Sequence, residues 1–216
     1  MTKTHSIFPT IFFQTEVDSN NLLKETLCDQ MLEASKYMKA PDLWFTNNLK
    51  TSFVEEPPGF NIIEDNFPLL EESYLETIGK VIKRPHEIDL TDEDIWYNVY
   101  LDGEFQDQHV HCSNLHLRQH HFSCIHFLSF NPEYHDPPSF VDPSSAVRSL
   151  TPAIDESPYQ NEWEPEVKEG DLIIFPIYMP HSVNPCKKSN YPRITITFNF
   201  TLTYYNSRES GELSDY

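Results

Sequence analysis

The chain has 216 residues, of which 34 are acidic and 15 are lysine or arginine, so its formal net charge at pH 7 is -19. This charge argues against unaided binding to nucleic acid or to an anionic membrane surface, because both would repel the chain. The length suffices for one hydrophobic core, and an aromatic content of 13% favours packed strands over disorder.

The N-terminal part of the chain predicts a short strand and then a helix. Ile7–Thr15 is apolar, and Pro9 near its start suits a strand at a sheet edge. Asp18 or Ser19 offers an N-cap for the helix that follows. The buried face of this helix is predicted from apolar residues at helical spacing, which are Leu22, Leu23, Leu27, Met31 and Met38.

A second helix is predicted after a polar and irregular stretch at residues 40–67. It should start near Pro68 and end before Pro85, because proline is tolerated in the first turn of a helix and stops a helix elsewhere. Its buried stripe is predicted to consist of Leu70, Tyr74, Leu75, Ile78, Val81 and Ile82.

From about residue 94 the pattern changes to strands separated by turns such as Asp102-Gly103 and Glu169-Gly170. The predicted strands are Ile95–Leu101, Phe105–Cys112, Phe122–Phe130, Asp171–Phe175, His181–Asn184 and Arg193–Tyr205. Helices followed by a strand-rich body predict an α+β, mainly β fold, in which the strands close on themselves or form two facing sheets.

Two segments do not follow this pattern. Residues 132–165 are rich in proline and acidic residues and have almost no periodicity, so they predict a long insert that is either a lid or binding loop, or a passive surface excursion. Residues 207–216 predict a disordered acidic tail.

Three histidines are the candidate metal ligands. His109 and His111 are one residue apart on a predicted strand, so their side chains share a face. His181 follows a turn and a buried strand at Gly170–Pro176, which can bring it in from a distant part of the chain. Imidazole suits iron, zinc, copper or nickel, and three such ligands leave positions open for a substrate. The alternative for each one is a satisfied core histidine.

The remaining histidines and the cysteines are assigned no metal role. His126 alternates with Ile125 and Phe127 and is predicted to face away from the interior of the strand-rich body. Cys112 adjoins His111 but would face the opposite side of the strand. The four cysteines have no C-x-x-C spacing, and no basic and then apolar leader opens the chain, so we expect free thiols in a reducing cytoplasm. The histidines in turns or irregular surroundings are His5, His86, His116, His120, His121 and His135.

The motifs around these histidines resemble those of the iron(II)- and 2-oxoglutarate-dependent oxygenases, more narrowly the prolyl-hydroxylase-like branch and the small oxygenases of marine bacteria and phages. The resemblance covers roughly residues 94–204 and rests on Trp96-Tyr97-Asn98, Gln108–His111, Ser123–Leu128, Gly170–Pro176, His181–Val183 and Arg193–Asn199. It implies a double-stranded β-helix barrel (jelly-roll, cupin-like) with the N-terminal helices packed on one sheet.

The domain organisation implied by this resemblance is a single oxygenase domain at residues 1–206. It would comprise a helical N-terminal part at 1–93 and a barrel at 94–206, with the lid-like insert at 132–165 inside the barrel.

One departure from the family concerns the metal ligands. Family members commonly have a carboxylate where this chain has His111. The ligand set is then either the three histidines, which we favour, or a set that includes Asp107, which shares a strand face with His109. Asp107 could instead accept a hydrogen bond that orients a ligating imidazole.

Cupins share the same barrel and offer a second resemblance. The spacing Gly103-x5-His109-x-His111 fits the first half of their signature, and Gly170-x5-Pro176 followed by His181 fits much of the second half. The chain departs from the cupin pattern at two places. Leu115 and His116 stand where cupins have a glutamate, and Tyr178 stands where they have a glycine.

A 2-oxoglutarate-dependent enzyme must also hold the distal carboxylate of its cosubstrate, for which the planar fork of arginine is well suited. Arg193 is the candidate anchor, with Thr195 beside it, because Arg193, Thr195, Thr197 and Asn199 share one face of the last strand. Asn98, Tyr100 and Asn199 are further predicted contacts of the cosubstrate. Phe127 stands where family members often supply a tyrosine, and it cannot donate a hydrogen bond.

The resemblance thus implies an Fe(II)- and 2-oxoglutarate-dependent dioxygenase, in which His109, His111 and His181 bind the iron, O2 is consumed and succinate is formed. The substrate would be a prolyl or other peptide, or a small molecule, with no nucleic-acid or membrane partner. The expected location is the cytoplasm, that of the host if the source is viral. Two alternatives remain at this point, a cupin-type three-histidine metalloenzyme that does not use 2-oxoglutarate and a non-enzymatic binding module on the same barrel.

Overall fold

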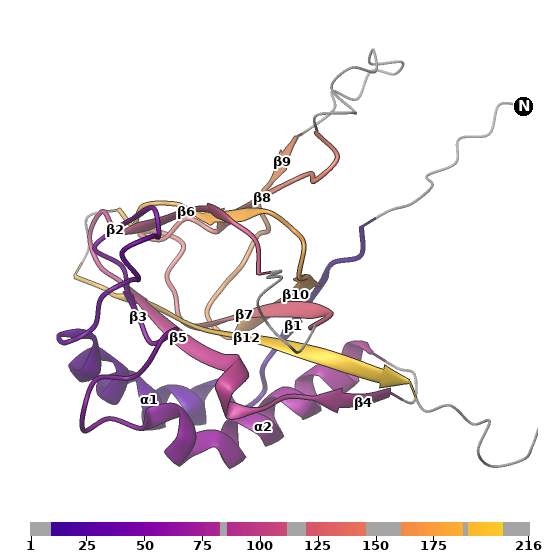
Figure 1. Cartoon of the computed structure of the whole chain (residues 1–216), viewed down its shortest axis with the longest axis horizontal. Helices are drawn as coiled ribbons and strands as arrows, with labels where there is room; N and C mark the ends of the chain where they lie inside the picture. Colours follow the sequence, from indigo (N-terminus) through magenta and orange to yellow (C-terminus); the bar gives the residue numbers. More distant parts are fainter. Residues whose placement is uncertain (1–9, 83–85, 112–119, 146–160, 188–189, 205–216) are drawn as a thin grey trace, which may run out of the picture.

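A computed structural model describes residues 10–82, 86–111, 120–145, 161–187 and 190–204 of the chain. The predictions for the start of the Ile7–Thr15 strand, for Cys112, for the middle of the 132–165 insert and for the tail at 207–216 fall outside the described residues. In the described part the fold is mainly β, with two helices layered on one of two antiparallel sheets (Figure 1).

The first helix, α1, spans Asn20–Ser35 and begins after Ser19 as predicted. Leu23, Leu27 and Met31 are fully buried, whereas Leu22 is 52% exposed and does not belong to the buried stripe. The strand before it, β1 (Phe13–Glu16), pairs with β10 and, among the described residues, with no other strand, which confirms the predicted edge position.

The second helix, α2, spans Ile62–Val81, so the predicted start near Pro68 is wrong. Ile62 and Ile63 are buried at the spacing that also buries Leu70, and this burial extends the helix six residues before the proline. Glu64 lies in the first turn, where a negative charge interacts favourably with the helix dipole. The helix is thus determined by its apolar face, despite the missing N–H of Pro68.

The sheet that packs against the helices has seven strands among the described residues, in the order β1-β10-β7-β12-β5-β3, and β4 also pairs with β12. Its strands other than β1 are β3 (Lys50–Thr51), β4 (His86–Asp89), β5 (Ile95–Tyr100), β7 (Phe122–Ser129), β10 (Asp171–Pro176) and β12 (Arg193–Tyr204). A short 3-10 helix, η1 (Asp92–Asp94), leads directly into β5.

The facing sheet has five strands in the described part of the chain, in the order β2-β6-β11-β8-β9. Its strands are β2 (Thr46–Asn47), β6 (Phe105–His109), β8 (Pro138–Val141), β9 (Glu162–Trp163) and β11 (His181–Val183). Figure 1 shows this sheet on the side of the seven-stranded sheet that faces away from the helices.

Alternation along the central strands separates two packed layers. On β12, Ile194, Ile196 and Phe198 join the large core between the helices and the sheet, and the intervening polar residues face the other sheet. On β7, Ile125 and Phe127 likewise face the space between the two sheets. The predicted jelly-roll arrangement with helices on one sheet is therefore confirmed.

Two parts of the chain contain more strand than the sequence pattern indicated. The N-terminal part at 1–93 includes β2, β3 and β4 in addition to its helices, so it is not purely helical. The insert at 132–165 is not irregular throughout, because β8 pairs with both β11 and β9. Short strands of two to four residues have no readable periodicity, since a period of two needs several repeats to be recognised. None of the described helices has the length and apolar character that crossing a membrane requires.

Candidate active site

The five-stranded sheet brings the three candidate ligands together. His109 is the last residue of β6 and His181 is the first residue of β11, and the two are direct partners in the antiparallel pairing of these strands. His111 lies two residues beyond the end of β6, where its backbone N–H donates to the carbonyl of Ile177 at 3.2 Å. The strand β6 is thus shorter than the predicted Phe105–Cys112, but His109 and His111 still point to the same side.

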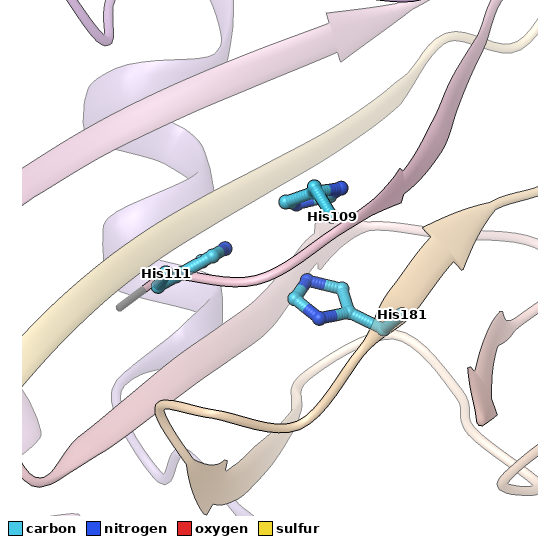
Figure 2. A group of neighbouring side chains, drawn as sticks. All are labelled: His109, His111 and His181. Carbon is cyan, nitrogen blue, oxygen red and sulfur yellow. The ribbon is translucent and has the colours of Figure 1, made fainter. Parts of the chain in front are cut away.

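The three imidazoles face a common space (Figure 2). Their possible ligand nitrogens all lie within 4.8 Å of one another. The ring centroids are 4.3 Å apart for His109 and His181, 5.0 Å for His111 and His181, and 5.3 Å for His109 and His111. One ion can therefore bind to all three rings with small adjustments, as predicted from the sequence spacing.

Each of these imidazoles has its Nδ1 held by another group of the protein. The Nδ1 of His109 donates to the backbone carbonyl of Asp107 at 2.9 Å, and that of His181 donates to the carbonyl of Met179 at 3.0 Å. The Nδ1 of His111 lies 3.1 Å from Oδ1 of Asn199 and 2.7 Å from Oγ of Ser123. Because a carbonyl oxygen can only accept, the proton sits on Nδ1 and the lone pair of Nε2 remains for a metal.

The protonation states of the rings suit metal binding as well. Burial lowers the pKa of His111 to about 3, with a smaller contribution from the neighbouring His109. Burial also lowers the pKa of His109, and it holds the pKa of His181 well below its ordinary value. All three imidazoles are therefore neutral at physiological pH, which is the form that binds metal.

Asp107 is the alternative ligand that the sequence left open. Its side chain is exposed, its Oδ1 accepts from the N–H of Gln108 at 2.8 Å, and it does not belong to the group of close ligand atoms. Its contribution to the cluster is the backbone carbonyl that holds His109. Asp107 thus orients a candidate ligand through its main chain.

A cavity of about 960 Å³ lies between the two sheets beside this cluster. A volume of this size accommodates a cosubstrate together with a further molecule or side chain. All of the site residues predicted from the sequence line this cavity, namely Asn98, Tyr100, His109, His111, His181, Arg193, Thr195 and Asn199.

Arg193 is the most buried charged residue of the cavity, with 1% of its surface exposed. Its Nη1 donates to the carbonyl of Asp136 at 3.0 Å and its Nη2 to the carbonyl of Asn184 at 3.1 Å, and the guanidinium carbon lies 4.3 Å from the ring centre of Tyr100. Its Nε has no hydrogen-bond partner, and no carboxylate of the described residues forms a salt bridge with it. Burial lowers its pKa from the ordinary value, but a guanidinium stays charged.

The neighbours of Arg193 supply further polar groups. Thr195 lies directly opposite Asn98 in the pairing of β12 with β5. The amide nitrogen of Asn98 donates to Oγ1 of Thr197 at 3.2 Å, whereas its buried Oδ1 has no partner. The hydroxyl of Tyr100 donates to Oε1 of Gln106 at 3.3 Å. A buried cation and buried unpaired polar atoms in one cavity indicate a site for a polar, anionic molecule.

Asn199, which is predicted to contact the cosubstrate, lines the cavity and also contacts a candidate metal ligand. Its side chain is bound to the ring of His111, so it supports a candidate ligand. Ser123 of β7, which the sequence interpretation did not single out, contacts the same ring, since its Oγ lies close to the Nδ1 of His111. His111 and Asn199 are 88 positions apart in the sequence. Their contact results from the pairing of distant strands, which the local sequence pattern does not specify.

Two other histidines have defined positions. His126 is fully buried on the opposite face of β7, where its Nε2 donates to Oδ1 of Asn20 and its Nδ1 accepts from the hydroxyl of Tyr74, so it faces away from the cavity as predicted. His120 lines the cavity, and its Nε2 lies 2.7 Å from Oδ1 of Asp94. The sequence pattern placed His120 in an exposed turn.

The sequence interpretation also missed the aromatic residues that the segment before α2 contributes to the cavity. Trp44 and Phe53 lie in the polar stretch that was predicted to be irregular, and both line the cavity next to Trp96 of β5. Large aromatic side chains in an otherwise polar segment are the one signal that could have indicated a binding role.

Residues 94–199 match the family described as "Putative 2OG-Fe(II) oxygenase". No curated protein matches the chain in sequence.

Solved structures of low sequence identity are similar over most of the chain. A prolyl-4-hydroxylase from Pseudomonas putida is 14% identical with a TM-score of 0.54, over 89% of this chain and 92% of that chain. A prolyl hydroxylase from Trichoplax adhaerens, in complex with a peptide fragment of the oxygen degradation domain of hypoxia inducible factor, is 13% identical with a TM-score of 0.58, over 94% and 87%. The non-heme, alpha-ketoglutarate-dependent carbocyclase SnoK of nogalamycin biosynthesis is 13% identical with a TM-score of 0.56, over 95% and 87%. At these identities the likeness shows a common fold.

Proposed function

We propose, from the match of residues 94–199 to the 2OG-Fe(II) oxygenase family and from the fold shared with such enzymes, that the chain is an Fe(II)- and 2-oxoglutarate-dependent dioxygenase that hydroxylates an organic substrate in the cavity between its sheets. The observation that carries the proposal is the combination, in one cavity, of three imidazoles whose Nε2 atoms point to a common space and a buried guanidinium that has no carboxylate partner among the described residues.

The residues fit an iron ion. His109, His111 and His181 would bind it through Nε2, because each Nδ1 is engaged elsewhere. Three protein ligands leave positions for the keto acid and for dioxygen. When bound, iron and 2-oxoglutarate supply the oxidation of a C–H bond, with formation of succinate and carbon dioxide.

The residues also fit 2-oxoglutarate. The distal carboxylate would pair with Arg193, whose Nε lacks a partner and whose buried charge is not neutralised by a carboxylate of the described residues. The carbonyls of Asp136 and Asn184 hold the guanidinium in place, and the face of Tyr100 supports it. Thr195 would add a hydroxyl to the same carboxylate. The protein thus presents the hydrogen-bond donors for the carboxylate in a fixed orientation.

The experiment is a test of cosubstrate recognition in the iron-loaded protein. We expect succinate to form from 2-oxoglutarate only with Fe(II), and we expect 2-oxopentanoate, which has a methyl group in place of the distal carboxylate, to bind about a hundredfold more weakly, because it leaves a buried cation unpaired. In Arg193→Gln this preference should disappear.

The control is Lys39→Gln, which removes one positive charge at an exposed position outside the cavity and should keep the preference. Thermal unfolding would verify that both variants are folded. Equal binding of the two acids by the unmodified protein, or activity that does not require 2-oxoglutarate, would contradict the proposal and favour a cupin-type metalloenzyme.

A further inference from the structure

The outer part of the cavity is lined by three aromatic rings in contact with one another. The ring centroids of Trp44 and Phe53 are 4.9 Å apart with an interplanar angle of 47°, and those of Phe53 and Trp96 are 5.1 Å apart at 82°. We call these three residues the aromatic wall. Trp96 is buried, whereas 42% of Phe53 is exposed, so the wall runs from the interior of the cavity to its mouth.

The aromatic wall adjoins the candidate metal ligands. The ring of Trp44 stacks on His109 with centroids 6.5 Å apart and an interplanar angle of 17°, and that of Trp96 lies 5.4 Å from His111. A group that binds against the wall is therefore next to the place where a C–H bond would be oxidised. The aromatic wall thus lies in the part of the cavity where a substrate would bind, whereas Arg193 lies in the part where the cosubstrate would bind.

Among the described residues, the acidic and basic side chains other than histidine that line the same cavity as the wall are, apart from Arg193, carboxylates. Glu93 and Asp94 belong to η1, which leads into β5 and Trp96, and both line the cavity. Asp107 lines it as well, and its backbone N–H donates at 2.9 Å to the carbonyl of Phe45, the residue after Trp44. Among the described residues, Arg193 is the one lysine or arginine that lines the cavity, and it is directed to the carbonyls at the buried end.

Aromatic faces beside carboxylates favour a cation that carries apolar groups. The negative face of an aromatic ring attracts a cation within about 6 Å, and alkylated ammonium groups gain most, because they lose little hydration when they leave water. A neutral apolar group would gain contact with the wall but nothing from the carboxylates, and an anion would be repelled. The net charge of -19 also favours the approach of a cation over that of an anion.

We propose that the substrate of this site carries a methylated ammonium group, which binds on the wall of Trp44, Phe53 and Trp96 beside Glu93 and Asp107. This inference rests on the proposed function for the chemistry that follows binding. In that chemistry, one oxygen atom of O2 is inserted into a C–H bond near the ammonium group, and the other oxidises 2-oxoglutarate to succinate and carbon dioxide. The same ammonium chemistry occurs in a free small molecule and in a trimethylated lysine of a peptide.

The test compares two probes that differ by one atom. Choline and 3,3-dimethylbutan-1-ol have the same shape, but choline has a positive nitrogen where the alcohol has a carbon. We expect calorimetric titration of the full chain, with and without Fe(II) and 2-oxoglutarate, to show binding of choline at least about tenfold tighter than of the alcohol. A short peptide with trimethyllysine, compared with the same peptide with unmodified lysine, forms the second arm and reports whether the source is a peptide.

Variants of the wall and of the carboxylates separate the two contributions. Phe53→Leu and Trp44→Leu keep apolar volume but remove an aromatic face, and Asp107→Asn removes a charge, so each should weaken choline binding by roughly three- to tenfold and leave binding of the alcohol nearly unchanged. The matched controls are Trp163→Leu and Asp29→Asn, because both residues are exposed and lie outside the cavity. The controls should bind choline as the unmodified chain does.

The outcomes of this test are distinguishable from those of the proposed function. Equal affinity for choline and the alcohol, or no binding of either cation probe, would overturn the ammonium assignment even if 2-oxoglutarate is still turned over. Choline binding that depends on the wall would support the assignment even if no succinate is formed, in which case the proposed oxygenase activity is the part that fails.

Discussion

The environment of each imidazole determines what the metal cluster can do. His109 and His181 are held by backbone carbonyls, which a substitution cannot remove, whereas His111 is held by the side chains of Asn199 and Ser123. His111 is also the residue that stands where the family commonly has a carboxylate. A neutral ligand at this position leaves the ion more positive than a carboxylate would. Binding of the ion therefore depends more on the groups that orient the ring of His111.

The first prediction concerns this partner. Asn199→Leu should weaken Fe(II) binding by about 10- to 100-fold, because the Nδ1 of His111 loses its amide acceptor and the ring loses its fixed orientation. Titration with Fe(II) under anaerobic conditions measures the effect. Thr203→Val, an exposed position on the same strand, is the control. Metal affinity unchanged in Asn199→Leu would mean that Ser123 alone orients the ring.

Single residues of the site were predictable to different degrees. The one-residue spacing of His109 and His111, and the polar face of the strand that starts at Arg193, follow from the period of a strand, and all these side chains reach one cavity. The contact of Asn199 with His111 and the wall contributed by Trp44 depend on which strands pair and on how a loop packs. Neither is encoded in a local period.

Individual elements show how packing overrides local signals. Helix α2 continues through Pro68 because its apolar face is buried on both sides of the proline. The side chain of Asn66 donates at 2.8 Å to the carbonyl of Ile62, in the turn before the proline. The predicted helix start near Pro68 is therefore wrong, because the sequence alone does not reveal that burial of the apolar face compensates for the hydrogen bond that the proline lacks.

The second prediction tests this compensation. Pro68→Ala should raise the free energy of unfolding by about 2 kcal/mol, because alanine restores the N–H donor and Pro68 is exposed and contributes little packing. Urea denaturation measures the change. Pro58→Ala, at an exposed turn position, should give no such gain. A loss of stability in Pro68→Ala would show that the ring of the proline is needed for the path of the helix.

At the scale of the whole molecule, His126 connects the helix layer to the seven-stranded sheet. It binds Asn20 of α1 and Tyr74 of α2 from its position on β7, and it is fully buried. Burial lowers its pKa to about 3. The unfolded chain, in which this imidazole has its ordinary pKa of 6.5, therefore takes up a proton at a higher pH than the folded chain does.

The third prediction follows from this difference in proton binding. The stability contributed by neutral His126 is complete above pH 6.5, and it falls by up to about 1.4 kcal/mol per pH unit as the pH decreases toward 3. His126→Gln, which cannot titrate, should flatten the decline of the free energy of unfolding between pH 6 and pH 4 by up to that amount. Urea denaturation with a metal chelator measures it, and parallel curves for the two proteins would refute the assignment.

The strand β12 connects the two ends of the candidate site without a break. Arg193 opens it and Asn199 lies on the same face, and hydrogen-bonded neighbours on both sides, β5 and β7, keep it from stretching or sliding. On the proposed assignment β12 sets the distance between the two groups that bind the dicarboxylic acid, which are the iron ion and the guanidinium. A residue inserted between Arg193 and Asn199 would turn one of these two side chains toward the helices. A keto acid with one carbon more or fewer should then find either the ion or the guanidinium out of reach.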